Sequence, residues 1–236
     1  MRPQHDKTDF WISKGIFADL QSFADLEIRI NALEIMKDEG DVFEIFVEGL
    51  LATQSLIQCE EHWIVGKIPS DLRNQYNLPN GVLGIDGIYR SKDNSITAYQ
   101  VKYRRNSHLT FSEVAPFLGV TEKFTDRVIF TNAQSLSENA KIRSRWFSKS
   151  DFYDLSQDQI AEITGWIYNK KIAIEKYKPD PRHQIQALDD IAIAFENNAR
   201  ATAVLACGTG KTLIGLWACE RQKPKSVLVL VPSLTL

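Results

Sequence analysis

Apolar and polar positions repeat with two different periods along the chain, and these periods predict where helices and strands lie. Over residues 10–37 apolar side chains recur every three or four positions, which predicts one or two helices. Gly40 ends that pattern, and Asp41 is a suitable cap for a further helix over residues 42–54. The start of the chain is therefore expected to be helical.

Short apolar runs bounded by turn residues predict the strands of a sheet. The expected strands cover 62–67, 82–90, 96–103, 127–131 and, at an edge, 151–155. Helices are expected after Pro69, over 111–120 with an interruption or a kink at Pro116, over 135–147, and after a cap at Ser156. Strands that alternate with helices favour an α/β fold with a layered sheet.

The runs 82–90 and 96–103 read as the two strands of a β-hairpin joined by a polar turn. Both strands are apolar on both faces, which is typical of buried strands. Asp86, Gln100 and Lys102 nevertheless stand within them. An acid, an amide and an amine on a buried sheet cost free energy unless they bind something, so we expect the function to reside in this hairpin.

The composition is that of an ordinary globular protein, with 44% hydrophobic and 25% charged residues, which excludes intrinsic disorder. The net charge of −2 creates no general basic field, so any contact with DNA must come from local patches. No apolar run is long enough to cross a bilayer, and the first residues lack the apolar core of a signal peptide. The three cysteines lack metal-ligand spacing, and we expect a cytoplasmic protein.

The hairpin residues Asp86, Gln100 and Lys102 fit the pattern D-x13-Q-x-K. Carboxylate and amide oxygens are ligands for a hard divalent cation such as Mg²⁺, and such a cation activates water and stabilises charge on a phosphate. A lysine beside them would orient the attacking water and stabilise a phosphoryl oxygen. The pattern therefore predicts hydrolysis of a phosphodiester.

Further residues of this region resemble the Mrr-like branch of the PD-(D/E)xK restriction-endonuclease superfamily. The resemblance covers residues 40–165 and rests on the order and spacing of Phe43-Glu44, Gly84-Ile85-Asp86, Gln100-Val101-Lys102-Tyr103, Val128-Ile129-Phe130-Thr131-Asn132 and Ser137-Glu138-Asn139-Ala140. It implies a mixed sheet flanked by helices and Mg²⁺- or Mn²⁺-dependent cleavage of double-stranded DNA. Whether cutting needs a dimer of nuclease domains on DNA stays open.

The resemblance also implies an acidic metal ligand on the helix before the hairpin, and this maps to Glu44. On the expected helix Glu44 borders the apolar face, whereas Glu48, the alternative ligand, points further toward solvent. Gln100 stands where most of the superfamily has Asp or Glu, as it does in Mrr-like members. One negative charge fewer should weaken metal binding in the absence of DNA.

Simpler readings of these residues remain open. Asp86-Gly87 is also a common turn dipeptide, Lys102 could snorkel from an edge strand, and Glu44 could be an exposed helix acid. Positive charge continues beyond the hairpin and either contacts DNA phosphates or forms a solvated turn; it comes from Arg104, Arg105 and His108.

The polar segment 170–181, which contains two prolines, is expected to be a linker. After it the pattern changes to a helix over 184–197, a strand over 201–206, a Gly-rich turn, a helix over 213–221 and a strand over 226–231. This order predicts the first β–loop–α–β unit of a RecA-like domain.

The Gly-rich turn has the residues and the context of a phosphate-binding loop. Its backbone N–H groups would bind the β-phosphate of ATP, Lys211 would reach the β- and γ-phosphates, and Thr212 would bind Mg²⁺. Residues 206–212, 181–184 and 229–233 resemble the phosphate-binding motif, the adenine-recognising glutamine motif and motif Ia of superfamily-2 helicases. The candidate ATP-binding residues are Gln184, Gly208, Thr209, Gly210, Lys211 and Thr212.

Together these patterns predict a nuclease domain over 1–169, the linker, and the start of a helicase-type ATPase over 182–236. The order resembles ATP-dependent restriction enzymes, which implies methyltransferase and target-recognition domains in the same polypeptide or complex. Because the sequence stops before an acidic Asp-Glu-x-His motif, we expect the N-terminal piece of a longer protein, unable to turn over ATP by itself. The alternatives are an inactive nuclease fold that couples a motor to DNA, and a repair or RNA helicase with an unrelated accessory domain.

Overall fold

The computed structural model describes residues 2–78, 84–105, 108–170, 179–180, 182–206, 208–222, 224 and 226–230. The chain divides into two compact units, Met1–Ile174 and Glu175–Leu236. Most of the expected linker, residues 171–178 and Pro181, lies outside the described residues.

The first unit is built around a mixed five-stranded sheet with the strand order β1-β2-β3-β5-β7. The strands are β1 (Cys59–Ile64), β2 (Gly87–Ser91), β3 (Ile96–Lys102), β5 (Asp126–Thr131) and β7 (Arg145–Phe147). β2 pairs antiparallel with β1 and β3, whereas β5 pairs parallel with β3 and β7. A separate parallel pair is formed by β4 (His108–Leu109) and β6 (Ser135–Leu136).

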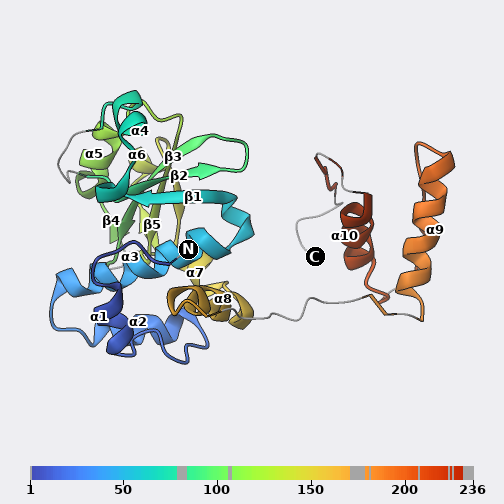
Figure 1. Cartoon of the computed structure of the whole chain (residues 1–236), viewed down its shortest axis with the longest axis horizontal. Helices are drawn as coiled ribbons and strands as arrows, with labels where there is room; N and C mark the ends of the chain where they lie inside the picture. Colours follow the sequence, from blue (N-terminus) through green and yellow to red (C-terminus); the bar gives the residue numbers. More distant parts are fainter. Residues whose placement is uncertain are drawn as a thin grey trace. The chain divides into compact units, whose positions relative to one another are not determined.

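Helices cover both faces of this sheet (Figure 1). One layer contains α1 (Thr8–Ser13), α2 (Phe23–Asn31), α3 (Met36–Thr53), α7 (Lys149–Tyr153) and α8 (Gln157–Ile167). The other contains α4 (Ser70–Gln75), α5 (Phe111–Val120) and α6 (Glu138–Lys141), and short 3-10 turns span Ser55–Ile57 and Val65–Lys67. Alternate strand residues feed separate hydrophobic cores, with Tyr99 in the first and Ala98 in the second. The expected α/β fold with a mixed sheet flanked by helices is confirmed for this unit.

The expected hairpin is formed by β2 and β3, whose register runs from Gly87 opposite Tyr99 to Arg90 opposite Ile96. Its first strand is shorter than predicted, since β2 begins at Gly87; residues 79–83 lie outside the described residues. A Cβ on Gly87 would lie 2.3 Å from the Tyr99 hydroxyl oxygen and 2.4 Å from the carbonyl oxygen of Trp63. The glycine therefore admits close packing inside the sheet, and Asp86-Gly87 is not a turn.

The predicted helix break at Gly40 is wrong, because α3 runs without interruption from Met36 to Thr53. A glycine inside a helix costs only about 1 kcal/mol, and α3 more than offsets this by burying an almost continuous run of residues after Val42. Asp41 consequently lies within the helix, where it is buried, instead of capping its start.

Two further predictions are wrong in the segment after β5. Residues 135–147, expected as one helix, form β6, α6 and β7, because Arg145–Phe147 pairs in parallel with Val128–Phe130 of β5. Residues 151–155, expected as an edge strand, belong largely to α7, whose start is fixed by a capping box between Ser148 and Asp151. The predicted strand over 62–67 lies a few residues earlier as β1. The helices expected after Pro69, over 111–120 and after Ser156 are confirmed as α4, α5 and α8.

The second unit contains α9 (Gln184–Asn197) and α10 (Lys211–Gln222), which confirms both expected helices. An ion pair of 2.6 Å between Arg221 and Asp189 connects them. The described residues within 201–206 and 226–231 do not form the expected strands. A strand needs a hydrogen-bonded neighbour, and these segments are unpaired, with Val204 92% and Leu228 82% exposed. No helix of the described residues is long and apolar enough to span a membrane.

Candidate active site

Three hydrogen bonds fix Asp86, two of them to β3 and one to the turn that follows β1. Its N–H donates to the Tyr99 carbonyl (3.1 Å), and its own carbonyl accepts from Val65 N–H (2.8 Å). Its carboxylate Oδ2 accepts from Val101 N–H at 2.6 Å. Because these bonds reach the residues on both sides of Gln100, Asp86 lies beside that glutamine, as the sequence predicted.

Gln100 is 3% exposed and holds its side chain in one orientation. Its Nε2 donates to the carbonyl oxygen of Gly84 at 3.1 Å. Gly84 has a φ of +82°, and a Cβ there would lie 2.8 Å from Phe117 N, so glycine is required for this approach. The other amide atom, Oε1, is buried without a hydrogen-bond partner. An unpaired buried oxygen is costly, which suits a position that receives a ligand.

Glu44 and Lys102 line a common hollow of about 420 Å³ at the end of β3. Glu44 belongs to α3 and Lys102 is the last residue of β3, so the hollow lies between this helix and the hairpin. The other lining residues are Met36, Glu39, Gly40, Val101, Tyr103, Arg104 and Arg105.

The carboxyl groups of Glu44 and Asp86 have raised pKa values. Burial, followed by the negative charges of Asp86 and Asp41, raises the pKa of Glu44 to about 8, although Lys102 acts in the opposite direction. Burial also raises the pKa of Asp86, despite the hydrogen bond from Val101 and the charge of Lys102. Two carboxyl groups that resist ionisation together are stabilised as anions by an added cation, and such groups are concentrated at functional sites.

The prediction that Glu48 points toward solvent is wrong. It is 2% exposed, and its Oε2 and Oε1 accept hydrogen bonds from Gln4 N–H (2.6 Å) and His5 N–H (2.9 Å). His62 Nε2 lies 3.3 Å from the same carboxylate. Since its oxygens are engaged by these donors, Glu48 anchors the N-terminal segment, whereas Glu44 is the helix acid that interacts with Asp86.

The N-terminal segment contributes residues that the sequence patterns did not reveal. The Gln4 side-chain amide donates to His62 O (2.6 Å) and accepts from Ile64 N–H (3.3 Å), so it pairs with edge strand β1 like a further strand. His5 Nε2 then lies 3.6 Å from Glu44 Oε2 and 3.5 Å from Asp41 Oδ1. No local pattern could reveal these contacts, since they join residues about 35 to 60 positions apart.

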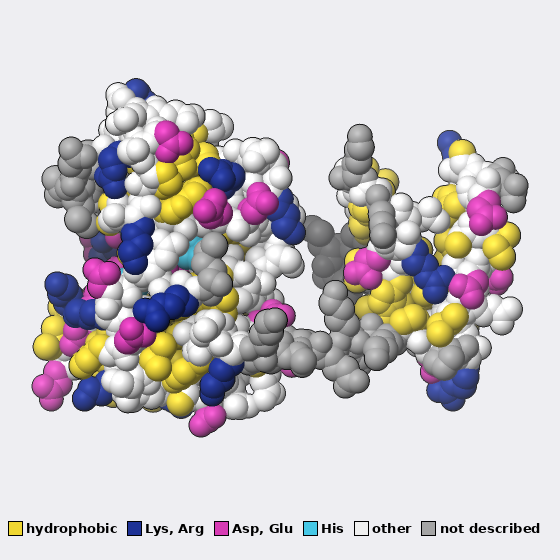
Figure 2. Space-filling model, viewed as in Figure 1, with side chains coloured by type: hydrophobic (Ala, Val, Ile, Leu, Met, Phe, Trp, Pro, Cys, Tyr) yellow, Lys and Arg dark blue, Asp and Glu magenta, His cyan; other side chains and the backbone are white. Residues whose placement is uncertain are grey.

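The basic residues beyond β3 are engaged with protein groups. Arg104 pairs with Glu113 at 2.7 Å, Arg105 Nε donates to Glu39 at 2.8 Å, and His108 Nδ1 lies 2.8 Å from the Ser135 hydroxyl. On the face shown in Figure 2, Lys and Arg side chains are interspersed with Asp and Glu side chains. This surface offers mixed charge in place of a single basic patch.

The described residues contain no group of three or more His, Cys, Asp or Glu side chains arranged to hold a metal ion. The predicted ligand set would not form such a group, because it consists of the two acids Glu44 and Asp86 and the amide Gln100. The unpaired Oε1 of Gln100 and the raised pKa values of both acids fit a divalent cation bound by oxygen atoms.

The second unit brings the predicted glutamine and the Gly-rich loop together. Gln184 Nε2 donates to Thr209 O at 3.0 Å, and its Oε1 accepts from Asp180 N–H at 2.8 Å. Lys211 Nζ donates to the carbonyl oxygens of Leu205 and Ala206, at 2.8 Å each. Gly208 and Gly210 both have a φ of +77°, and Thr212 lies in the first turn of α10. The loop thus precedes a helix N-terminus, the arrangement that binds phosphate.

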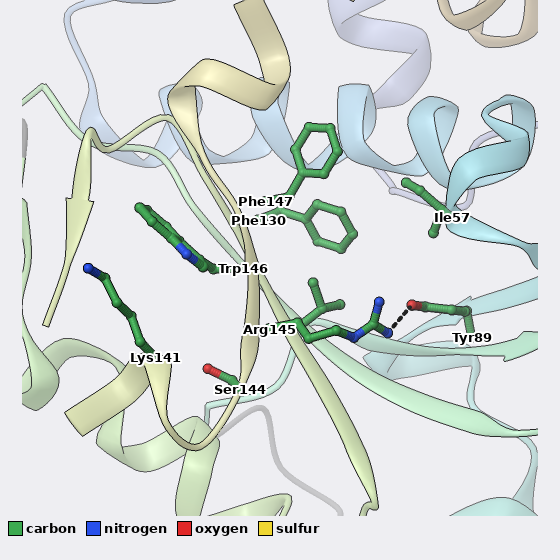
Figure 3. A pocket seen from close by; sticks show the side chains of 9 residues that line it. Ile57, Tyr89, Phe130, Lys141, Ser144, Arg145, Trp146 and Phe147 are labelled. Carbon is green, nitrogen blue, oxygen red and sulfur yellow. Dashed lines mark hydrogen bonds between the residues drawn. The ribbon is translucent and has the colours of Figure 1, made fainter. Parts of the chain in front are cut away.

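A separate hollow of about 460 Å³ lies beside edge strand β7 (Figure 3). Its polar side chains have protein partners: Arg145 Nη2 donates to Tyr89 Oη at 3.4 Å and pairs with Asp126, and Lys141 pairs with Glu138 at 2.8 Å. These pairs leave the hollow without a free charge to orient a ligand, and none of the predicted site residues lines it.

Two comparisons with known proteins give matches, one to a C-terminal segment of the sequence and one to the structure. Residues 177–236 match the family model described as "Type III restriction enzyme, res subunit". The structure is similar to the one titled "ATP-dependent Type ISP restriction-modification enzyme LlaBIII bound to DNA", with a TM-score of 0.63 and 19% sequence identity. The match covers 86% of this chain and 13% of that chain. No curated protein matches the sequence.

At 19% identity the similarity to the restriction-modification enzyme shows a shared fold. The chain spans a small part of that enzyme's length, and the family model covers only the C-terminal segment. The chain therefore combines a mixed α/β unit, which shares its fold with part of a Type ISP restriction enzyme, with a C-terminal segment that matches the res-subunit family model.

Proposed function

We propose that residues 1–169 are the Mg²⁺-dependent DNA endonuclease domain of an ATP-dependent restriction enzyme. The observation that carries this proposal is the electrostatic interaction of two acids with raised pKa values, Glu44 and Asp86, with each other and with Lys102. Asp86 is hydrogen-bonded to the residues on both sides of Gln100, whose Oε1 is unpaired. The similarity to a DNA-bound restriction-modification enzyme supports double-stranded DNA as the substrate.

Three side chains would hold the cation, which can be Mg²⁺ or Mn²⁺. Asp86 would be the anchor, its carboxylate held in place by the Val101 N–H bond to Oδ2, and Gln100 would supply the neutral oxygen Oε1. Glu44 supplies the second negative charge from α3. Once bound, the cation would lower the pKa of a water molecule and stabilise negative charge on the phosphate.

Lys102 is proposed to orient the attacked phosphate. It lines the hollow of about 420 Å³ together with Glu44, and its charge interacts with both acids. A lysine ammonium offers three donors without an acceptor, so it can bind a phosphoryl oxygen and the attacking water while keeping the acids ionised.

The second unit is proposed to be the start of the ATP-driven motor that governs this nuclease. Backbone groups of Gly208, Thr209 and Gly210 would bind phosphate, Lys211 would leave the carbonyls of Leu205 and Ala206 for the β- and γ-phosphates, and Thr212 would bind Mg²⁺; Gln184 would recognise adenine. Methyltransferase and target-recognition domains would be present in the same polypeptide or complex.

The test is nicking of supercoiled plasmid DNA by the purified chain in Mg²⁺, with EDTA as the blank. We expect Mg²⁺-dependent nicking that falls by at least about 100-fold in Asp86→Ala and in Lys102→Ala. Cleavage that survives both substitutions would refute the assignment.

DNA binding without any Mg²⁺- or Mn²⁺-dependent cleavage would instead support the alternative of an inactive nuclease fold that couples the motor to DNA. Such binding should weaken steeply with salt. The side chains favour the active enzyme, because the sequence retains the acid, the amide and the lysine of the pattern, Asp86, Gln100 and Lys102.

A further inference from the structure

Asn132 extends the pairing of β3 and β5 beyond the last residues of both strands. The parallel register ends with Lys102 opposite Thr131. The Asn132 side chain then takes the place of a strand backbone: Oδ1 accepts from Arg104 N–H at 2.6 Å and Nδ2 donates to Arg104 O at 2.8 Å. Both backbone groups of Arg104, two residues after Lys102, are thereby held by one buried amide.

A buried carboxylate fixes the orientation of that amide. Asn132 Nδ2 gives its second hydrogen to Glu27 Oε1 at 2.9 Å. Glu27 also accepts from Lys149 Nζ (3.0 and 2.8 Å) and from the Tyr153 hydroxyl at 2.6 Å. Burial opposes ionisation of Glu27, but the hydrogen bonds from Lys149, Tyr153 and Asn132 hold its pKa below the usual value. An ionised acceptor makes these bonds stronger than neutral ones.

Tyr103, which lies between Lys102 and Arg104, is held by α2 and α3. The Tyr103 hydroxyl donates to Asn31 Oδ1 of α2 at 2.8 Å. The Tyr103 ring packs edge-on against Phe43 of α3, with ring centroids 5.5 Å apart. Phe43 directly precedes Glu44, so this contact connects the chain after Lys102 to the helix that carries the second acid.

We propose that Asn132 and Glu27 form a positioning pair that fixes Lys102 in the candidate active site; this rests on the proposed nuclease function. Neither side chain lines the hollow that Glu44 and Lys102 share. Asn132 holds the backbone that follows Lys102, and Glu27 holds Asn132. A small displacement of a catalytic group can lower a rate by roughly 100-fold, so loss of this pair slows cleavage without weakening DNA binding.

The first experiment uses Asn132→Asp in the full chain, a change that keeps the shape and the acceptor but removes the donor. It also sets a second carboxylate against Glu27. At saturating Mg²⁺ and DNA, we expect the single-turnover cleavage rate to fall roughly 10- to 100-fold. DNA affinity measured in Ca²⁺ should change by less than about twofold, since Asn132 is 4% exposed. The matched control is Asn139→Asp, the same substitution at an exposed position of α6.

The second experiment adds Glu27→Gln to Asn132→Asp, which supplies an amide donor for the new carboxylate. If the two residues act as a pair, the double variant should cleave about tenfold faster than Asn132→Asp alone. Hydrogen exchange of the Arg104 amide, measured at a temperature where each variant is folded, should be faster in Asn132→Ala than in the wild type.

A wild-type cleavage rate in folded Asn132→Asp, or unchanged protection of the Arg104 amide in folded Asn132→Ala, would overturn the inference alone. If Asn132→Ala does not fold, the rescue decides: equal rates for the single and the double variant would also overturn it. Absence of cleavage by the wild-type chain would overturn the proposed nuclease function, and the positioning role with it.

Discussion

Glu44 and Glu48 lie one helical turn apart on α3, yet their carboxylates have opposite environments. Glu48 accepts backbone hydrogen bonds from Gln4 and His5 and lies 3.3 Å from His62 Nε2. Glu44 instead lies among other acids, and its pKa is raised to about 8 by burial and by the charges of Asp86 and Asp41. The same residue type is therefore satisfied by hydrogen bonds at one position and held among like charges at the other.

This contrast predicts separable effects for the two glutamates. Glu48→Ala leaves the half-buried N–H groups of Gln4 and His5 without an acceptor, and should lower the free energy of unfolding by about 3 kcal/mol. Glu44→Ala should lower Mg²⁺-dependent cleavage at least about 100-fold while leaving stability near that of the wild type. Urea unfolding and plasmid nicking, measured on both variants, check this.

The opposite pattern, with cleavage lost in folded Glu48→Ala and retained in Glu44→Ala, would assign the helix acid of the site to Glu48. The exposed Glu60→Ala serves as the matched control and should alter neither property.

The raised pKa of Glu44 predicts how stability depends on pH in the metal-free protein. The folded state keeps a proton on Glu44 up to a pH of about 8, whereas the unfolded chain loses it near the usual value of 4.5. The folded state therefore binds more protons in this window, and its stability must fall as the pH rises from about 4.5 to about 8. Glu44→Gln should reduce this fall, as followed by urea unfolding in EDTA between pH 5 and 8.

An equal slope in the wild type and Glu44→Gln would show that Glu44 does not titrate abnormally. Glu60→Gln, at an exposed position of β1, controls for the loss of one acidic group. Added Mg²⁺ should flatten the wild-type slope, because the cation replaces the proton.

Gln100 predicts a trade between metal affinity and stability. Gln100→Glu adds a negative charge to the ligand set, so Mn²⁺ should bind about tenfold more tightly in the absence of DNA, as titration calorimetry would show. The variant should also melt at a lower temperature without metal, because it removes the donor to Gly84 O. Unchanged Mn²⁺ affinity would exclude Gln100 as a ligand; the exposed Gln134→Glu is the control for added charge.

The hairpin could be predicted from the sequence because its information is local. The apolar strands, the turn between them and the spacing of Asp86, Gln100 and Lys102 lie within about twenty residues, and β2 and β3 form as expected. The wrong prediction for residues 135–147 has the opposite cause, because a contact distant in sequence decides their structure. Residues 135–147 carry a helix-like pattern, but pairing of Arg145–Phe147 with β5 decides their structure.

The environment of the site could not be predicted, because its partners are distant in sequence. Glu48 is 44 residues from Gln4, and Glu27 is 126 residues from Tyr153. The helical spacing of apolar residues predicted that Glu48 points toward solvent. That pattern contains no information about the N-terminal segment, which covers this side of α3. Such contacts become visible only when the elements are placed in space.

In the second unit, we expect the Gly-rich loop to bind nucleotide through Lys211. Its ammonium donates to two backbone carbonyls, of Leu205 and Ala206, and phosphate oxygens would compete for these donors. Lys211→Ala should abolish binding of a fluorescent ATP analogue by the chain, and Arg200→Ala, an exposed position in the same unit, should not. Equal binding by the wild type and Lys211→Ala would argue against a phosphate-binding loop.

Anomalous diffraction from crystals of the chain soaked in Mn²⁺ tests the proposed metal site directly. The account predicts one Mn²⁺ peak at about 2.0–2.3 Å from the Asp86 carboxylate and from Gln100 Oε1, with Glu44 turned toward it. The peak should be absent in crystals of Asp86→Ala. An absence of Mn²⁺ between these residues in the wild-type protein, at concentrations that support cleavage, would contradict the account.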